Sequence, residues 1–245
     1  MYKEHNALMK PTTNCKLWQY MSFSKFVNLL IGKMYFRRLD SFEDVFEGQW
    51  PKMNKKYIEY VKEKEGDTIG SFTELGRKLL YVSCFHKSDA ETAFMWKQYA
   101  NTDGIAIYTS FERLRESFTE CDQDVFISDV NYIDYTKEAI FDMSNMLVPA
   151  IYKRDSFRFE QEVRCISMLD DLHTNIYYRE ESNNKKIDFD KLPVGIKLPV
   201  NLFKLIEKIY ISPYAEGYIE ENVKDCLKSK GLDIPVIKSD LYTIN

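Results

Sequence analysis

Two glutamates in the stretch DSFRFEQEVRCIS (Asp155–Ser167) are the residues best suited to chemistry. If this stretch is a β-strand, the side chains of Glu160 and Glu162 project from the same face, about 7 Å apart. Like charges at that separation raise each other's pKa unless cations offset them, and Arg158 and Arg164 share that face. One carboxylate could hold a sugar hydroxyl while the other orients a nucleophile or stabilises an oxocarbenium ion. The alternative is a solvated face with cross-strand ion pairs.

A pair of arginines in MYFRRLDSF supplies a candidate anion site. Arg37 and Arg38 are adjacent, so one of them must point away from the core face of its strand. A guanidinium in that position can bind a phosphate or diphosphate through two hydrogen bonds. The alternative is a salt bridge to Asp40, Glu43 or Asp44 in the acidic segment that follows.

The same acidic segment raises a metal hypothesis. Asp44 and Glu47 could hold Mg²⁺ together with Glu160 and Glu162, because this ion prefers hard oxygen ligands. The spacing of the acidic residues matches no known ion-binding loop, so a solvated loop is the competing interpretation. We therefore expect no metal site and keep a Mg²⁺-dependent nuclease only as an alternative function.

Further candidates for ligand contacts are a histidine and several aromatic residues. His86 could act as a general base or bind a ribose hydroxyl, or it could be an ordinary histidine at a strand end. Trp96 and Tyr99, three residues apart in an expected helix, could stack on a flat ring, although this spacing is also typical of a buried core. Tyr20, on an earlier strand, presents the same choice.

Hydrophobic periodicity predicts the elements that would position these residues. The segment from Leu205 to Ser239 has the pattern of a strand, a turn, a helix ending near Gly231 and a last strand, whereas the polar segment Arg179–Lys191 predicts a mobile loop. Strands and helices intersperse without a strict βαβ rhythm, which predicts an α+β fold with mixed, largely antiparallel sheets. The other expected strands are 17–20, 33–39, 79–86, 103–110, 124–133 and 155–167, and the other expected helices are 22–32, parts of 51–80, 90–101, 110–118 and 136–152.

The composition limits the class of protein. The chain has 245 residues, of which 44% are hydrophobic, so we expect a single domain over residues 1–245. A formal net charge of −4 gives no overall electrostatic case for nucleic-acid binding. Five scattered cysteines and the lack of a signal peptide or of an apolar run of about 18 residues predict a cytoplasmic protein without a membrane span. Rossmann, P-loop, α/β-hydrolase and zincin motifs are missing from the sequence.

Taken in order, these segments resemble a known family. LWQYMSFSKFVNLL, YVSCFH, MWKQYA, GIAIYTS, YKRDSFRFEQEVRCIS and IEKIYISPYA together resemble the bacterial domain-of-unknown-function family DUF2971, over about residues 17–242. That resemblance implies a cytoplasmic bacterial protein of the kind suspected in phage defence.

A looser resemblance is to ADP-ribosyltransferases. In those enzymes a first strand carries a ligand for NAD, a helix and a second strand follow, and a later strand ends in Glu/Gln-x-Glu. Here Tyr20 stands in the first strand, Tyr35–Arg38 in the second, and Glu160 and Glu162 in the motif EQE. The chain departs from that pattern in having no Ser-Thr-Ser motif, no clear histidine or arginine in LWQY, and Arg164 after the second glutamate.

The resemblance implies an ADP-ribosyltransferase-like fold that takes NAD as a substrate, with an unknown acceptor that could be protein or nucleic acid. Glu162 would hold the nicotinamide ribose, Glu160 would orient the acceptor, and Glu162→Gln is expected to keep the fold and remove NAD turnover. The remaining expected ligand contacts are Tyr20, Arg37, Arg38, His86, Trp96 and Arg164. The alternatives are the nuclease described above and a non-catalytic sensor or binding module of a defence system.

Overall fold

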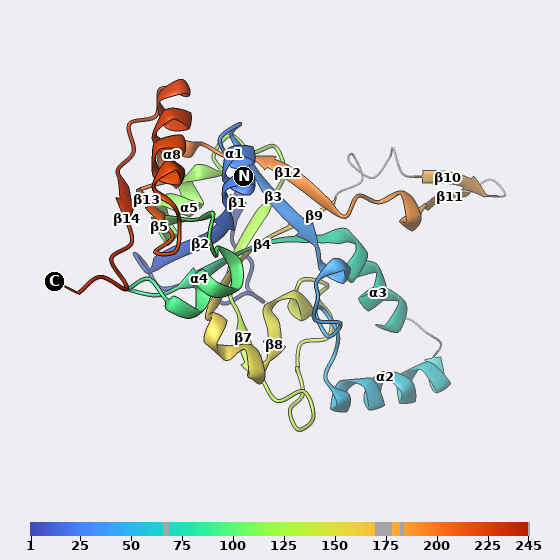
Figure 1. Cartoon of the computed structure of the whole chain (residues 1–245). Coiled ribbons are helices and arrows are strands. Elements are labelled where there is room, and N and C mark those ends of the chain that lie inside the picture. The colour runs from blue at the N-terminus through green and yellow to red at the C-terminus, as the bar shows by residue number, and fades with distance from the viewer. Residues whose placement is uncertain (66–68, 170–177, 182–183, 245) are drawn as a thin grey trace.

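A large mixed sheet organises the chain, in the computed structural model that describes residues 1–65, 69–169, 178–181 and 184–244 (Figure 1). Its strands are β1 (Tyr2–Lys3), β2 (Lys16–Ser22), β3 (Lys33–Arg38), β4 (Leu80–Lys87), β5 (Gly104–Ser110), β6 (Val125–Asp129), β9 (Glu162–Met168), β12 (Gly195–Pro199), β13 (Lys208–Ile211) and β14 (Val236–Lys238). They follow the order β1-β6-β9-β4-β2-β5-β13-β14, and β3 joins β4 and carries β12. The pairs β1–β6 and β13–β14 are parallel and the others are antiparallel. The expected α+β class is confirmed.

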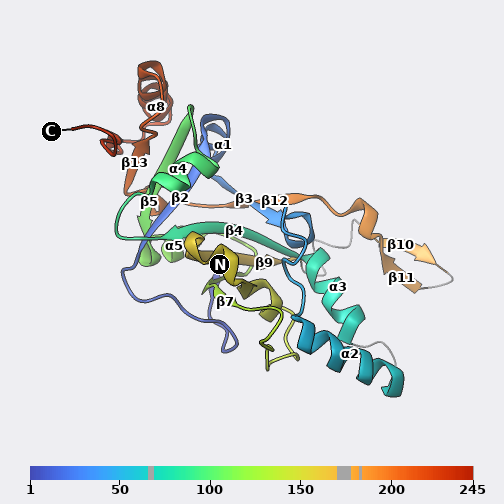
Figure 2. The same cartoon turned by 60° about the horizontal axis from the view of Figure 1, so that its bottom comes forward.

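The two faces of the sheet carry different apolar clusters. The larger cluster packs α1 (Phe23–Leu29), α5 (Phe111–Ser117), α7 (Leu202–Leu205) and α8 (Gly217–Ser229) against alternate residues of the strands. On the opposite face α4 (Ala93–Tyr99) packs on β2 through an aromatic cluster, and η2 (Val148–Ile151) packs on β4 and β9. α2 (Lys52–Glu65) and α3 (Ile69–Leu79) lie at the far end of the molecule from α8 (Figures 1 and 2).

A fork in the sheet creates the space for a site. β9 pairs with β4 along nearly its whole length, from Leu80 to His86. On the other edge of β4, β2 pairs only near the end, at His86 and Lys87, and β3 pairs only near the start, at Tyr81 and Val82. β2 and β3 therefore diverge, and neither register includes residues 83–85 of β4.

The helix expected over residues 136–152 is wrong. The structure instead has an irregular segment, the short 3₁₀ helix η2 and the strand β8 (Tyr152–Arg154), which pairs with β7 (Asn131–Ile133). Short polar side chains explain the difference, because Asp134, Asp142 and Asn145 each accept a hydrogen bond from the backbone amide two residues later. Such local turns compete with helical hydrogen bonds.

The expected strand over 155–167 is correct only from Glu162 onward. Asp155–Glu160 forms a 3₁₀ helix, η3, and Gln161 takes the left-handed conformation with φ of 40° before β9 begins. The polar segment expected as a loop over 179–191 is also partly wrong. Within its described residues, β10 (Tyr178–Glu181) pairs with β11 (Asn184–Ile187) as an antiparallel hairpin that projects from the large sheet, followed by the 3₁₀ turn η5 (Phe189–Lys191) (Figure 1).

Two further expectations concern cysteines and membranes. All five cysteines are free thiols. None of the helices in the described part of the chain is both long enough and apolar enough to cross a membrane.

Candidate active site

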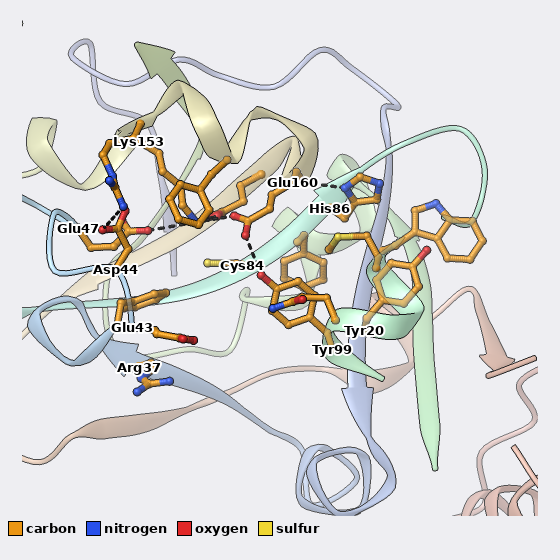
Figure 3. Close-up of a pocket in the computed structure, with 18 of the residues that line it drawn as sticks. Tyr20, Arg37, Glu43, Asp44, Glu47, Cys84, His86, Tyr99, Lys153 and Glu160 are labelled. Atoms are coloured by element: carbon orange, nitrogen blue, oxygen red, sulfur yellow. Dashed lines mark hydrogen bonds and ion pairs between the residues drawn. The ribbon is translucent and has the colours of Figure 1, made fainter. Parts of the chain in front are cut away.

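A pocket of about 540 Å³ opens at the fork between β2 and β3 (Figure 3). This volume falls within the range of pockets that bury small molecules and cofactors, roughly 300–1,000 Å³. The carboxylates singled out by the sequence line this concavity rather than an outer surface. The lining residues that bear on the chemistry are Tyr20 on β2, Arg37 on β3, His86 on β4, Tyr99 on α4, Glu160 on η3 and Glu162 on β9.

A buried ionic cluster forms the floor of the pocket. The ammonium of Lys153, on β8, lies 2.6 Å from Glu162 Oε1 and 3.2 Å from Glu47 Oε1, and it also pairs with Glu160 Oε2. Arg164 donates from Nε to Glu162 Oε2 at 2.6 Å. It also binds Glu47 through two parallel hydrogen bonds of 2.8 and 2.9 Å. Three carboxyl groups thus share two cations, and ionisation of all five would leave one excess negative charge.

The cluster shifts the pKa values of the neighbouring Glu160 and Glu162 in opposite directions. Burial and, after it, the adjacent Glu162 raise the pKa of Glu160 to about 7, against the opposing pull of Lys153. Burial also opposes ionisation of Glu162, but the charges of Arg164 and Lys153 outweigh it and hold the pKa of Glu162 well below its usual range. Glu162 is therefore a carboxylate at neutral pH, whereas Glu160 exchanges a proton near neutrality.

Glu160 is held from three directions. Tyr99 donates its phenol hydroxyl to Glu160 Oε1 at 2.8 Å, and Lys153 pairs with the other carboxyl oxygen (Figure 3). His86 Nδ1 lies 2.7 Å from the backbone carbonyl of Glu160, and because a carbonyl only accepts, this nitrogen carries the proton. His86 Nε2 then accepts from the Thr92 hydroxyl at 2.9 Å. Burial lowers the pKa of His86, so the ring is neutral and both its nitrogens are engaged.

Aromatic rings form one wall of the pocket. Tyr20 lines it and stacks on Trp18, with ring centroids 6.1 Å apart. Trp96 meets the edge of Tyr20 at 4.9 Å but is fully buried, and its indole donates to Glu91 at 2.7 Å. Trp96 does not line the pocket, so its position does not fit the direct ligand contact expected for it. It packs against the side of Tyr20 that faces the core.

The two adjacent arginines separate as their alternation on β3 requires. Arg37 lines the pocket and is oriented by Ser41, whose hydroxyl accepts from Nε at 3.2 Å and whose carbonyl accepts from one terminal nitrogen. Arg38 instead pairs with Asp40 at 2.6 Å and donates to the carbonyl of Leu192. Of the pair, only Arg37 lines the pocket, and the salt bridge considered for Arg38 is confirmed.

Arg164 does not line the pocket. Its side chain is completely buried, and its contacts with Glu47 and Glu162 place it beneath the floor, where it cannot contact a ligand as expected. Burial by itself opposes the charge, yet the neighbouring carboxylates raise the pKa of Arg164, so the guanidinium stays ionised.

The acidic segment after η1 (Leu39–Ser41) is not a free set of ligands. Asp44 accepts two hydrogen bonds from Arg154, at 2.8 and 3.1 Å, and Glu47 is bound by Arg164 and Lys153. Among the residues that the structure describes, no group of three or more His, Cys, Asp or Glu side chains could hold a metal ion. The carboxylates of the nuclease hypothesis are all paired with cations of the chain itself.

Sequence reasoning missed Lys153 and the pairing of Glu47 with Arg164. Lys153 is the middle residue of a three-residue strand, too short for its alternation to give a signal. The only usable signal was that Lys153 and Arg154 are adjacent on a strand, so their side chains must point to opposite sides and one of them must point inward. Glu47 was considered beside Glu160 and Glu162 only as a metal ligand, and nothing in the sequence indicated that its partner would be Arg164, 117 residues away.

A family model and several solved structures are similar to this chain. A family model described as "Protein of unknown function (DUF2971)" matches residues 95–165, a shorter stretch than the resemblance over 17–242 implied. No curated protein matches the chain. The matched stretch contains Tyr99, Lys153, Glu160 and Glu162.

Solved structures of DarT from Thermus sp. 2.9 are similar to this chain. The complex with NAD⁺ has a TM-score of 0.43 and 8% sequence identity, covering 96% of this chain and 100% of that one. The complex with ADP-ribosylated ssDNA has a TM-score of 0.40 and 10% identity, covering 94% and 97%.

Proposed function

We propose that this chain cleaves NAD and transfers ADP-ribose to an acceptor, as an ADP-ribosyltransferase-like enzyme. The observation that carries the proposal is a pair of neighbouring carboxyl groups, Glu160 and Glu162, that line one pocket with opposite pKa shifts. Two carboxyl groups whose environments push their pKa values apart can take different roles in one reaction. The reaction needs such a division, with one group to stabilise positive charge and one to accept a proton.

Glu162 suits the first role. When the bond between the ribose C1′ and nicotinamide breaks, its electron pair leaves with nicotinamide and positive charge develops on the ribose. A fixed carboxylate beside that charge stabilises the transition state. Glu162 accepts one hydrogen bond on each oxygen, from Lys153 and from Arg164, and is also hydrogen-bonded to the side chain of Glu160. A carboxylate can accept about four hydrogen bonds, so capacity remains for a ribose hydroxyl.

Glu160 suits the second role. The acceptor nucleophile forms the new bond to C1′ and must lose a proton as it does so. A general base works best when its pKa lies near the working pH, and that of Glu160 is about 7. Its contact with Tyr99 aims the carboxyl group across the pocket (Figure 3).

Arg37 and Tyr20 suit the binding of the dinucleotide. Arg37 has one terminal nitrogen that is not engaged by Ser41, and a guanidinium can hold a diphosphate. Tyr20 offers the face or edge of a ring, and burial raises the pKa of its phenol to about 12, so it stays neutral. The roles of His86, Trp96 and Arg164 are then to position these groups.

The test is incubation of the purified chain with NAD, with free nicotinamide and mass added to protein or nucleic acid measured by mass spectrometry. We expect nicotinamide release by the wild type and a loss of about 100-fold or more in Glu160→Gln. Glu116→Gln, at an exposed position of α5, is the matched control and should be fully active. Full turnover in Glu160→Gln would contradict the role given to this residue, and no turnover by the wild type with any acceptor would contradict the function.

Further experiments test the acceptor of ADP-ribose and the biological role. Protein, single-stranded nucleic acid and water are tested separately as acceptors. A role in phage defence, which the DUF2971 resemblance implies, predicts that cells expressing the wild type resist phage infection and that cells expressing Glu160→Gln do not. Activity that is abolished by a chelator without NAD consumption would instead support the nuclease alternative.

A further inference from the structure

We propose that Lys153 is the positioning residue of this site, and that its ammonium fixes how a single proton is shared between Glu160 and Glu162. This inference rests on the proposed function only for its kinetic consequence, because the proton sharing itself is a property of the ligand-free chain. Lys153 was not among the residues singled out by the sequence.

The geometry makes Lys153 the centre of the cluster. It contacts all three carboxyl groups, whereas Arg164 contacts only Glu47 and Glu162. Only 8% of its side chain is exposed, and its ammonium also lies 4.7 Å from the ring centre of Phe157. A buried lysine keeps its charge only where carboxylates offset its desolvation, and here they do.

The parallel pair of β7 and β8 delivers this lysine to the floor. Lys153 is in register with Tyr132, whose hydroxyl accepts from the backbone amide of Glu162 at 2.8 Å. One small sheet therefore positions both the lysine and the first residue of β9. Besides the cluster itself, with Glu47 and Arg164, the titratable groups around it include Cys84 and His86 on β4, Tyr99 on α4, Tyr132 on β7 and Tyr135.

Charge counting gives two predictions of opposite sign. With three carboxyl groups and two cations, neutrality requires one proton, and Glu160 is the group whose pKa allows it. Lys153→Met removes a cation, so the midpoint of Glu160 should rise by about one pH unit or more. Glu47→Gln removes a carboxylate, so Glu160 can ionise without leaving an excess charge, and its midpoint should fall.

The experiment is a ¹³C-carboxyl NMR titration of the full chain without ligand, for the wild type, Lys153→Met, Lys153→Arg and Glu47→Gln. Lys153→Arg keeps the charge and should keep the Glu160 midpoint close to that of the wild type. Lys87→Met is the control, because Lys87 pairs with Asp129 outside the pocket. An unchanged midpoint in Lys153→Met, or shifts of the same sign in Lys153→Met and Glu47→Gln, would overturn the inference.

A measurement on the wild type covers the case in which Lys153→Met does not fold. The ¹⁵N signal of the Lys153 ammonium should titrate with the same midpoint as Glu160, and an ammonium signal that ignores this titration would overturn the inference. If the wild type cleaves NAD, the acid limb of its pH–rate profile should move upward in Lys153→Met, whereas a merely structural lysine would lower the rate without moving that limb. If the wild type does not cleave NAD, the proposed function is contradicted. The NMR titration then tests the role of Lys153 by itself.

Discussion

The imidazole of His86 donates from Nδ1 to the backbone carbonyl of Glu160 at 2.7 Å, so a side chain of β4 fixes the main chain that carries the candidate base. The carbonyl belongs to the residue just before the left-handed Gln161. We therefore expect His86 to act on the position of Glu160 rather than on a proton of the substrate.

This relationship predicts different outcomes for two amides at position 86. Asparagine places its amide near Nδ1 and can still donate to the Glu160 carbonyl, whereas glutamine places its amide near Nε2. We expect His86→Asn to retain nicotinamide release within about tenfold of the wild type and His86→Gln to lose more, because a lost buried hydrogen bond costs about 1–3 kcal/mol. Steady-state kinetics of both variants are the measurement. Higher activity in His86→Gln would mean that Nε2, and not Nδ1, serves the site.

The two glutamates should differ in what they contribute to stability. Glu162→Gln leaves Lys153 and Arg164 buried with fewer partners, and breaking such a pair costs about 3–5 kcal/mol. Glu160→Gln replaces a group that is already half protonated near neutral pH, and should cost only about 1 kcal/mol. Urea unfolding at pH 7 measures both. We therefore expect Glu162→Gln to have a lower free energy of unfolding than Glu160→Gln, and equal losses in the two variants would contradict the assignment of charge.

The raised pKa of Glu160 predicts a pH dependence of stability. The group has a pKa of about 4.5 when unfolded and about 7 when folded, so between these values the folded chain binds more protons. Its stabilising contribution is complete below pH 4.5 and is lost as the pH rises to 7, at no more than about 1.4 kcal/mol per pH unit. Glu162 has the opposite shift, and its contribution is lost only as the pH falls below 4.5.

The measurement compares urea unfolding of the wild type and Glu160→Gln at pH 5, 6 and 8. The free energy of unfolding of Glu160→Gln should rise relative to that of the wild type as the pH rises across this window, because the variant lacks the titrating group. Parallel curves for the two chains would show that Glu160 does not titrate there.

The adjacent arginines offer a matched pair for substrate binding. Arg37→Gln should raise the KM for NAD by about tenfold or more, because it removes the cation placed to hold a diphosphate. Arg38→Gln should leave KM unchanged and lower the free energy of unfolding slightly, since Arg38 pairs with Asp40 away from the pocket. Kinetics with NAD as the varied substrate distinguish them, and an equal rise in KM for both would contradict the placement.

Strong periodicity predicted the elements that carry most of the fold. The strand β2, the helices α4, α5 and α8 and the strand β5 all form where alternation or a helical stripe indicates them. The secondary-structure predictions were wrong where short polar side chains or one unusual backbone angle determine the conformation of the chain. Asp134 and Asp142 break the expected helix through local turns, and the left-handed Gln161 ends the 3₁₀ helix that replaces the start of the expected strand.

The candidate site was found from spacing, but its arrangement was not. Glu160 and Glu162 do meet in one pocket, yet they approach it from a 3₁₀ helix and a strand rather than along one strand face. Arginine is rarely buried without a partner, so nothing in the local sequence places Arg164 beneath the floor. Only its partner Glu47, brought close by tertiary folding, reveals that position.

The pairing of Arg164 with Glu47 also bears on how the chain reaches its native state. Closing a contact across 117 residues is entropically slow, and until it forms the guanidinium on β9 has one counter-ion fewer. We therefore expect water to leave the strands around Arg164 only after the segment around residue 47 has packed against them. Deleting that segment should yield an unfolded chain rather than a folded chain with a wider pocket entrance. The deletion would then remove the cooperative unfolding transition together with any activity.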